Sequence, residues 1–166
     1  MTITTCRPRK QIMAALTLTL LWIVPLHVAW AADARLSKGQ TLYVPVYSHI
    51  YSGDRERPVY LAVTVSIRNT DPTHSIHLTA VDYYDSAGKQ LRRFLEKPIT
   101  LAPMASTRYV VKESDKSGGS GANFIVSWQS DTPINPPLTE GVMISTASQL
   151  GISFVTRGVP IVAAQP

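Results

Sequence analysis

One stretch of alternating residues constrains the fold of this chain more than any other feature. Between Pro58 and Arg68, apolar residues occupy every second position, and these residues are Val59, Leu61, Val63, Val65 and Ile67. Successive side chains of an extended chain point to opposite faces, so the pattern predicts a β-strand with one buried face. A helix would need apolar residues at three- and four-residue spacing, which this stretch does not have.

The same extended pattern recurs in one segment before this stretch and in several segments after it. Residues typical of turns separate these segments. The segments are 41–47, 76–85, 89–95, 99–101, 107–112, 123–129, 141–146 and 151–156. In the turns at 69–72 and 85–88, Asn and Asp side chains can bond their own backbone, and Gly88 can adopt a positive φ. We therefore expect an all-β chain that forms a single antiparallel β-sandwich, immunoglobulin-like or jelly-roll-like.

Several segments lack the alternation and are interpreted as connections or chain ends. These are 32–40 (a loose lead-in), 48–58 (a charged loop), 113–122, 132–138 and 161–166 (a tail). The prolines of 132–138 indicate a stiff connection, and the glycines of 113–122 predict the most flexible part of the domain. The sandwich domain is then expected over 41–160.

The first 31 residues have the composition of a secretion signal. A basic region with Arg7, Arg9 and Lys10 precedes an apolar run over 12–24, and Ala29 and Ala31 provide the small residues that a signal peptidase requires. We expect cleavage after Ala31 and a periplasmic or secreted protein. An uncleaved segment would be the only attachment to a membrane, although its apolar run is just short of a comfortable span.

The composition of the mature chain excludes several kinds of chemistry. Without the three basic residues of the signal, 13 Lys and Arg stand against 11 Asp and Glu, a net charge of +2. This balance, without a basic run that interleaves with aromatics, does not indicate a nucleic-acid partner. The single cysteine, Cys6, lies in the signal, so the mature chain has no disulfide, thiolate nucleophile or cysteine-ligated metal.

Four segments resemble a family of small exported bacterial proteins whose domain has no assigned function. They are 42–48, 66–71, 140–144 and 151–158. This resemblance extends over the whole mature chain and implies the location and the fold, but no mechanism. More faintly, 66–85 and 124–133 are similar to the soluble transducers of microbial sensory rhodopsins, which are small β-sandwich proteins that form homo-oligomers. Those transducers work in the cytoplasm, so their signalling role is not carried over.

Two groups of polar residues are candidates for a ligand or partner site. Trp128, Gln129 and Asp131 end a strand beside the proline-rich segment, which is typical of a binding surface, although a core tryptophan is an equal interpretation of Trp128. Glu140 and Arg157 are expected at the same end of two neighbouring antiparallel strands. There they would either pair across the strands or contribute to a site for a polar ligand.

The segment 82–85 supports a second hypothesis, a carbohydrate-binding or carbohydrate-active protein. Asp82 and Asp85 flank Tyr83 and Tyr84, and paired carboxylates beside aromatic rings occur in sugar sites. The hypothesis requires one tyrosine to be exposed beside a carboxylate. Asp85 also fits the opening position of the turn.

Known catalytic and metal motifs are not found in the sequence. His74 and His77 have no second ligand pair with matching spacing, so they are interpreted as surface residues around a turn. There is no nucleophile elbow, phosphate loop or zinc-protease motif, and we expect no enzyme, no metal and no cofactor. The favoured function is a non-catalytic binding or accessory module for an envelope protein or a small polar ligand. The alternatives are the carbohydrate protein and a structural subunit of a homo-oligomer.

Overall fold

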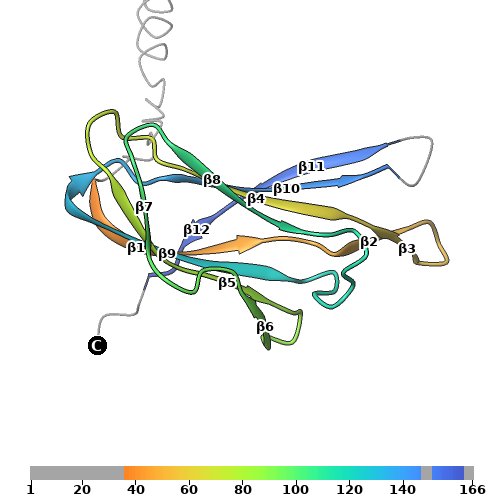
Figure 1. Cartoon of the computed structure of the whole chain (residues 1–166). Helices are drawn as coiled ribbons and strands as arrows, with labels where there is room; N and C mark the ends of the chain where they lie inside the picture. The colour runs from red at the N-terminus through yellow and green to blue at the C-terminus, as the bar shows by residue number, and fades with distance from the viewer. Residues whose placement is uncertain (1–35, 147–150, 163–166) are drawn as a thin grey trace, which may run out of the picture. The chain divides into compact units, whose positions relative to one another are not determined.

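A computed structural model describes residues 36–146 and 151–162 of the chain. These residues form twelve β-strands (Figure 1). No helix long and apolar enough to cross a membrane occurs in the described residues. The all-β prediction is confirmed.

The larger sheet has six strands in the order β12-β1-β9-β5-β6, with β7 also paired to β5. The strands are Val159–Pro160 (β12), Ser37–Pro45 (β1), Asn123–Ile134 (β9), Ile76–Tyr84 (β5), Gln90–Arg93 (β6) and Ile99–Leu101 (β7). All of these pairings are antiparallel. Because β9 lies between β1 and β5, its backbone is bonded on both sides.

The smaller sheet has four strands in the order β11-β10-β4-β8. They are Ile152–Arg157 (β11), Leu138–Ser145 (β10), Ala62–Arg68 (β4) and Ser106–Val111 (β8). A separate hairpin joins β2 (His49–Ser52) to β3 (Arg57–Tyr60). Figure 1 shows the six-stranded and the four-stranded sheet as facing layers, the arrangement of an antiparallel β-sandwich.

The core lies between the inner faces of these two sheets. In β4, Val63, Val65 and Ile67 are fully buried, as the alternation predicted. Phe124 and Val126 of β9 face them from the larger sheet and are also fully buried. Each such side chain contributes about 1.5–3 kcal/mol relative to an exposed position, so alternation alone positions much of the core.

The long predicted strand around Leu61 is divided in the structure. Leu61 leaves the strand ladder, and its backbone N–H donates to the carbonyl of Ser48 at 3.0 Å. The residues before it form β3, which pairs with β2, so the expected charged loop over 48–58 contains a hairpin. Most side chains of this hairpin are exposed, which explains why burial patterning does not reveal it.

Two connections expected from composition belong to strands. β1 begins at Ser37, inside the expected lead-in, and β9 continues through Pro133 to Ile134. Ser37 pairs with Ile134, whereas Gly39 pairs with Gln129, so β9 is irregular between these two pairs. Backbone pairing here extends beyond the alternation of apolar residues.

The glycine-rich segment is packed, contrary to the expected flexibility. Gly118 is buried, and its carbonyl accepts hydrogen bonds from the backbone N–H and the hydroxyl of Ser86, both at 3.0 Å. The carbonyl of Gly119 accepts from the backbone N–H of Ser48 at 3.0 Å. Small residues here permit close packing rather than mobility.

Candidate ligand-binding groove

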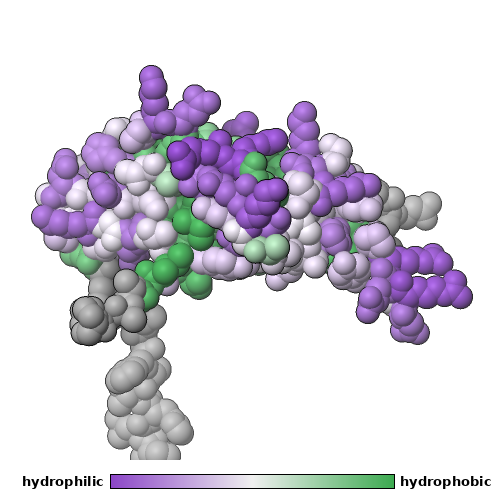
Figure 2. Space-filling view, turned by 90° about the horizontal axis from the view of Figure 1, so that it is seen from below, coloured by the Kyte–Doolittle hydropathy of each residue, from purple (hydrophilic) through white to green (hydrophobic). Residues whose placement is uncertain are grey.

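The outer face of the larger sheet carries rows of polar side chains. Outward positions alternate with core positions, and the strand register places Gly39, Gln129 and His77 side by side. The next row contains Thr41 and Ser127. Figure 2, which views this side of the molecule, shows hydrophilic and near-neutral residues over most of it, with a hydrophobic strip and a few smaller hydrophobic patches.

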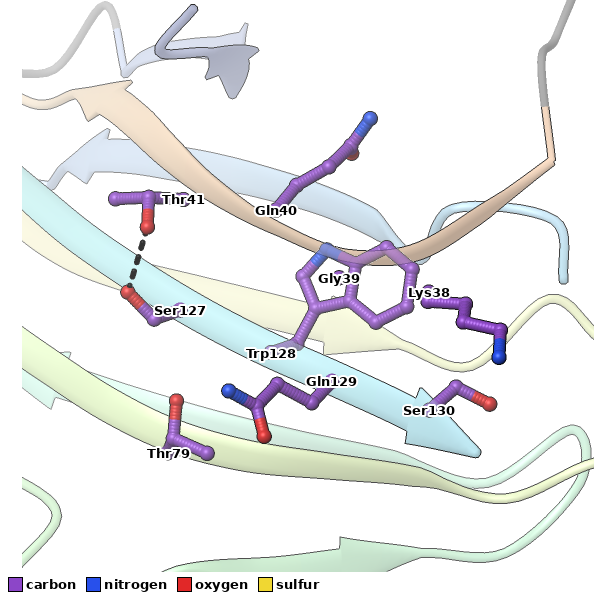
Figure 3. A pocket seen from close by; sticks show the side chains of 9 residues that line it. All are labelled: Lys38, Gly39, Gln40, Thr41, Thr79, Ser127, Trp128, Gln129 and Ser130. Carbon is purple, nitrogen blue, oxygen red and sulfur yellow. Dashed lines mark hydrogen bonds between the residues drawn. The ribbon is translucent and has the colours of Figure 1, made fainter. Parts of the chain in front are cut away.

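A groove of about 440 Å³ lies across β1, β9 and β5 on this side (Figure 3). Its lining residues are Lys38, Gly39, Gln40, Thr41, Thr79, Ser127, Trp128, Gln129 and Ser130. Hydroxyl groups predominate, together with the amide of Gln129 and the ammonium group of Lys38. Such a lining offers both donors and acceptors to a polar ligand.

Irregularities in the strand pairing occur beside the groove. Leu78 pairs with Trp128 and Ala80 with Ser127, so Thr79 is an extra residue in β5. Ser130 begins the irregular part of β9, where β1 and β9 change register. Such bulges redirect side chains and are frequent next to functional sites.

Gly39 allows β1 to approach β9 closely at the groove. A Cβ atom at this position would lie 2.8 Å from the backbone oxygen of Trp128. A side chain at position 39 would therefore require the backbone to move. The groove depends on glycine at this point of β1.

Many of the polar groups in the groove are free to bind. Thr41 and Ser127 share one hydrogen bond of 3.0 Å, and the hydroxyl of Ser130 donates to the carbonyl of Ser75 at 3.4 Å. The exposed amide of Gln129 makes no hydrogen bond with the described residues, and Lys38 makes no ion pair with them. These two groups stay available at little cost in desolvation.

The structure separates the three residues predicted at the end of β9. Trp128 is 1% exposed, so the core interpretation holds and its indole cannot serve as a partner surface. Its inward direction follows from the alternation that buries Phe124 and Val126. Gln129 lies in the groove, and Asp131 is exposed in the irregular part of β9, outside the lining.

Asp82 and Tyr84 lie on the same outer face as Gln129, but beyond the groove. Asp82 forms an ion pair with Arg93, whose Nε lies 3.3 Å from Oδ1 of Asp82. Tyr83 is buried against Phe124, with 5.0 Å between ring centroids, and Tyr84 is half-buried. The acidic and aromatic segment therefore does not form a sugar site with a free carboxylate.

Asp85 occupies the turn, as its alternative interpretation states. Its Oδ1 accepts hydrogen bonds from the backbone N–H groups of Ala87 at 2.9 Å and Lys89 at 2.8 Å. These bonds replace backbone partners that the turn cannot provide.

Glu140 and Arg157 lie on the outer face of the smaller sheet. They are register partners of β10 and β11, and Arg157 Nη2 lies 3.8 Å from Glu140 Oε1. The predicted cross-strand pair is confirmed. Because this face belongs to the other sheet, the pair and Gln129 do not contribute to one site.

The polar corner at 69–74 is a structural element. Asp71 Oδ1 accepts hydrogen bonds from the backbone N–H groups of Thr73 at 2.9 Å and His74 at 2.8 Å. Hydrogen bonds hold the pKa of Asp71 well below its ordinary value. The bond from the Thr73 backbone lowers it most, and the bonds from His74 and from the Thr73 hydroxyl lower it further. His77 instead contacts Thr100 at 3.0 Å. The described residues contain no group of three potential metal ligands.

Sequence reasoning missed most of the groove. Thr41 and Ser127 were identifiable as outward positions of predicted strands, but a threonine or serine on an outer face is ordinary. Thr79 reaches the groove through a bulge, which the sequence does not indicate. Lys38 lies in the segment expected to be a loose lead-in, but the structure places it in β1.

The fold and the groove together define a class, an antiparallel β-sandwich protein with a polar groove on one sheet. Within it, the chain belongs to the family of proteins of unknown function designated DUF3124, whose sequence model matches residues 39–161. The predicted membership of such a family is confirmed, while the fainter similarity to rhodopsin transducers stays a prediction.

No curated protein matches this chain. The crystal structure of Thermotoga maritima 1070 is similar, with 10% identity and a TM-score of 0.44, over 72% of this chain and 92% of that one.

Proposed function

We propose that this protein is an exported, non-catalytic binding module that holds a small polar ligand in the groove of the larger sheet. The observation that carries the proposal is the collection of uncommitted polar groups there, above all the Gln129 amide and the Lys38 ammonium group. The surrounding hydroxyls suit a ligand that itself carries hydroxyl or carbonyl groups. A neutral saccharide is one such ligand.

The rigidity of the groove supports binding. Its floor consists of β1, β9 and β5, and β9 is paired on both sides from Asn123 to Gln129. Polar side chains on such strands are held in place before a ligand arrives, which lowers the entropy cost of association. The volume of about 440 Å³ is within the usual range for small-molecule sites.

The chemistry of the lining supports a non-catalytic role. Lys38 is the one titratable side chain among the lining residues. General acid–base catalysis needs a titratable group positioned at the reacting atom, and a nucleophile is commonly activated by an adjacent base, so a single exposed lysine offers little support for either. The signal-like composition of residues 1–31 supports an exported location, where the ligand would be met.

The test is a calorimetric titration of the purified protein, produced from its full reading frame, with a panel of neutral mono- and disaccharides. We expect saturable binding that Gln129→Ala weakens about three- to tenfold, the effect of one lost hydrogen bond. Gln90→Ala is the matched control, since Gln90 is an exposed glutamine of β6 outside the groove.

The proposal fails if no sugar binds saturably, or if Gln90→Ala weakens binding as much as Gln129→Ala. The exported location is tested separately by N-terminal sequencing of protein recovered from the envelope fraction. A mature chain that begins at Ala32 would agree with the cleavage expected after Ala31.

A further inference from the structure

Two arginines project from the outer face of the smaller sheet. In the pairing of β4 with β8, Ser66 is opposite Arg108 and Arg68 is opposite Ser106. Arg68 and Arg108 are therefore diagonal neighbours on adjacent strands, with Cβ atoms about 7–8 Å or less apart. Both side chains are exposed, so their guanidinium groups can converge on a ligand between them.

A depression of about 370 Å³ lies between these arginines. Three outward hydroxyl side chains, those of Thr64, Ser66 and Ser106, line it together with the two guanidinium groups. The lining therefore consists largely of hydrogen-bond donors, and it contains no carboxylate. Such a surface favours an anion over a cation or a neutral molecule.

Neither arginine forms an ion pair with the described residues. The ion pairs among them are His74–Asp71, Arg93–Asp82 and Arg157–Glu140. Arg68 Nε donates to Ser66 Oγ at 3.2 Å, which orients the side chain and leaves its Nη groups available. Two like charges on neighbouring strands repel each other, and a bound anion would remove this repulsion.

We propose that Arg68 and Arg108 form a binding site for a phosphate group. A carboxylate has two oxygens, which one guanidinium fork can engage. A phosphate has enough oxygens to accept two forks and additional hydroxyl donors at the same time. The combination of two guanidinium groups with Ser66 and Ser106 matches the larger anion.

This site is independent of the groove. It belongs to the smaller sheet, and its lining shares no residue with that of the groove. Either site can therefore fail its test without affecting the other.

The neighbourhood of the site suggests two sources for the phosphate. Val110, Ile144 and Val155 lie on the same outer face and are 44%, 46% and 58% exposed. A phosphate attached to an apolar chain, as in a lipid head group, would find apolar surface beside its charge. A soluble phosphate or phosphate ester would use the arginines alone.

The experiment titrates the protein, produced from its full reading frame, with inorganic phosphate at constant ionic strength, followed by NMR and calorimetry. We expect saturable binding that Arg68→Gln and Arg108→Gln each weaken about tenfold or more. Arg57→Gln removes the same charge from an exposed position of the β2–β3 hairpin, outside the depression, and we expect less than about a threefold effect because screening weakens a distant charge. Unfolding curves of all the variants check that each is folded.

Arg108→Lys keeps the charge and removes the fork, and it should bind more weakly than the wild type. A second arm measures binding to phosphatidylcholine vesicles with and without phosphatidic acid. Binding to the acidic vesicles that Arg68→Gln abolishes identifies a lipid head group, and binding in the phosphate arm alone identifies a soluble ligand. The proposal is overturned if neither arm shows saturable binding. It is also overturned if Arg57→Gln weakens binding as much as Arg68→Gln, because diffuse charge would then account for it.

Discussion

At the scale of single residues, Asp71 shows that a polar group can hold a corner of the fold together. Its carboxylate closes the turn after β4, and the neighbouring Asn69 donates through Nδ2 to the carbonyls of His74 at 2.8 Å and Ala102 at 3.0 Å. Both side chains are buried. Their role is therefore to satisfy backbone groups that leave the sheet.

Asp71 should make the stability of the protein depend on pH in acid. Hydrogen bonds hold the pKa of Asp71 in the folded state well below the value of about 3.9 expected for an unfolded chain. Its contribution is therefore fully present above a pH of about 5 and declines as the pH falls through about 4 towards the folded pKa. We expect the free energy of unfolding, from urea titrations between about pH 5 and pH 3, to fall more steeply for the wild type than for Asp71→Asn.

The control for this prediction is Asp131→Asn. Asp131 is an exposed carboxylate that makes no hydrogen bond with the described residues. This variant should follow the wild-type slope. A slope for Asp71→Asn equal to that of the wild type would show that the turn does not depend on the charge.

At the scale of elements, the glycine-rich segment packs against the end of β5. A Cβ atom at Gly118 would lie 1.9 Å from the hydroxyl oxygen of Tyr83 and 2.8 Å from the Cβ of Ala122. Burial raises the pKa of Tyr83, and its hydroxyl already shares a 2.8 Å hydrogen bond with Ser48. The ring therefore cannot move aside without breaking a buried bond.

Gly118→Ala should destabilise the protein by about 1–3 kcal/mol, the usual cost of overpacking. The measurement is the free energy of unfolding in urea. Gly121→Ala is the control in the same segment, since its Cβ would meet Ser86 Oγ at 3.3 Å and the residue is exposed. Equal stability of the two variants would contradict the packing role of this segment.

The elements also show how far the sequence predicts this structure. The alternation of Val63, Val65 and Ile67 reveals β4 because one face of that strand is buried against the other sheet. The pairing of Glu140 with Arg157 follows from two short strands joined in sequence. By contrast, the hairpin β2–β3 has no buried face to produce a pattern.

The two candidate sites escape prediction for a related reason. The groove depends on the bulge at Thr79 and on the contact of Gly39 with β9, both of which are features of strand pairing. Arg68 and Arg108 become neighbours only through the register of β4 with β8. Outward residues have no periodicity that says which residues they will lie beside.

At the scale of the whole molecule, β1 depends on the last strand. Val159 and Pro160 of β12 pair with Tyr43 and Leu42, and the backbone N–H of Ile161 donates to the carbonyl of Thr41 at 2.8 Å. β1 therefore lies between β9 and β12, and the larger sheet is incomplete until both of these strands have paired with β1. Contacts between segments so distant in sequence are costly to form and favour slow folding.

A chain that ends at Gly158 should lose the bonds that β12 makes to β1. We expect its free energy of unfolding to fall by about 1–3 kcal/mol, since each net backbone hydrogen bond contributes about 0.5–1.5 kcal/mol. The edge of β1 at Leu42 and Tyr43 would then be open, and open strand edges pair with other chains. Size-exclusion chromatography should therefore show more self-association than for the control, a chain that ends at Val162 and retains β12. If the two chains have equal stability and elute together, β12 does not protect this edge, and β1 must be stabilised by β9 and the core alone.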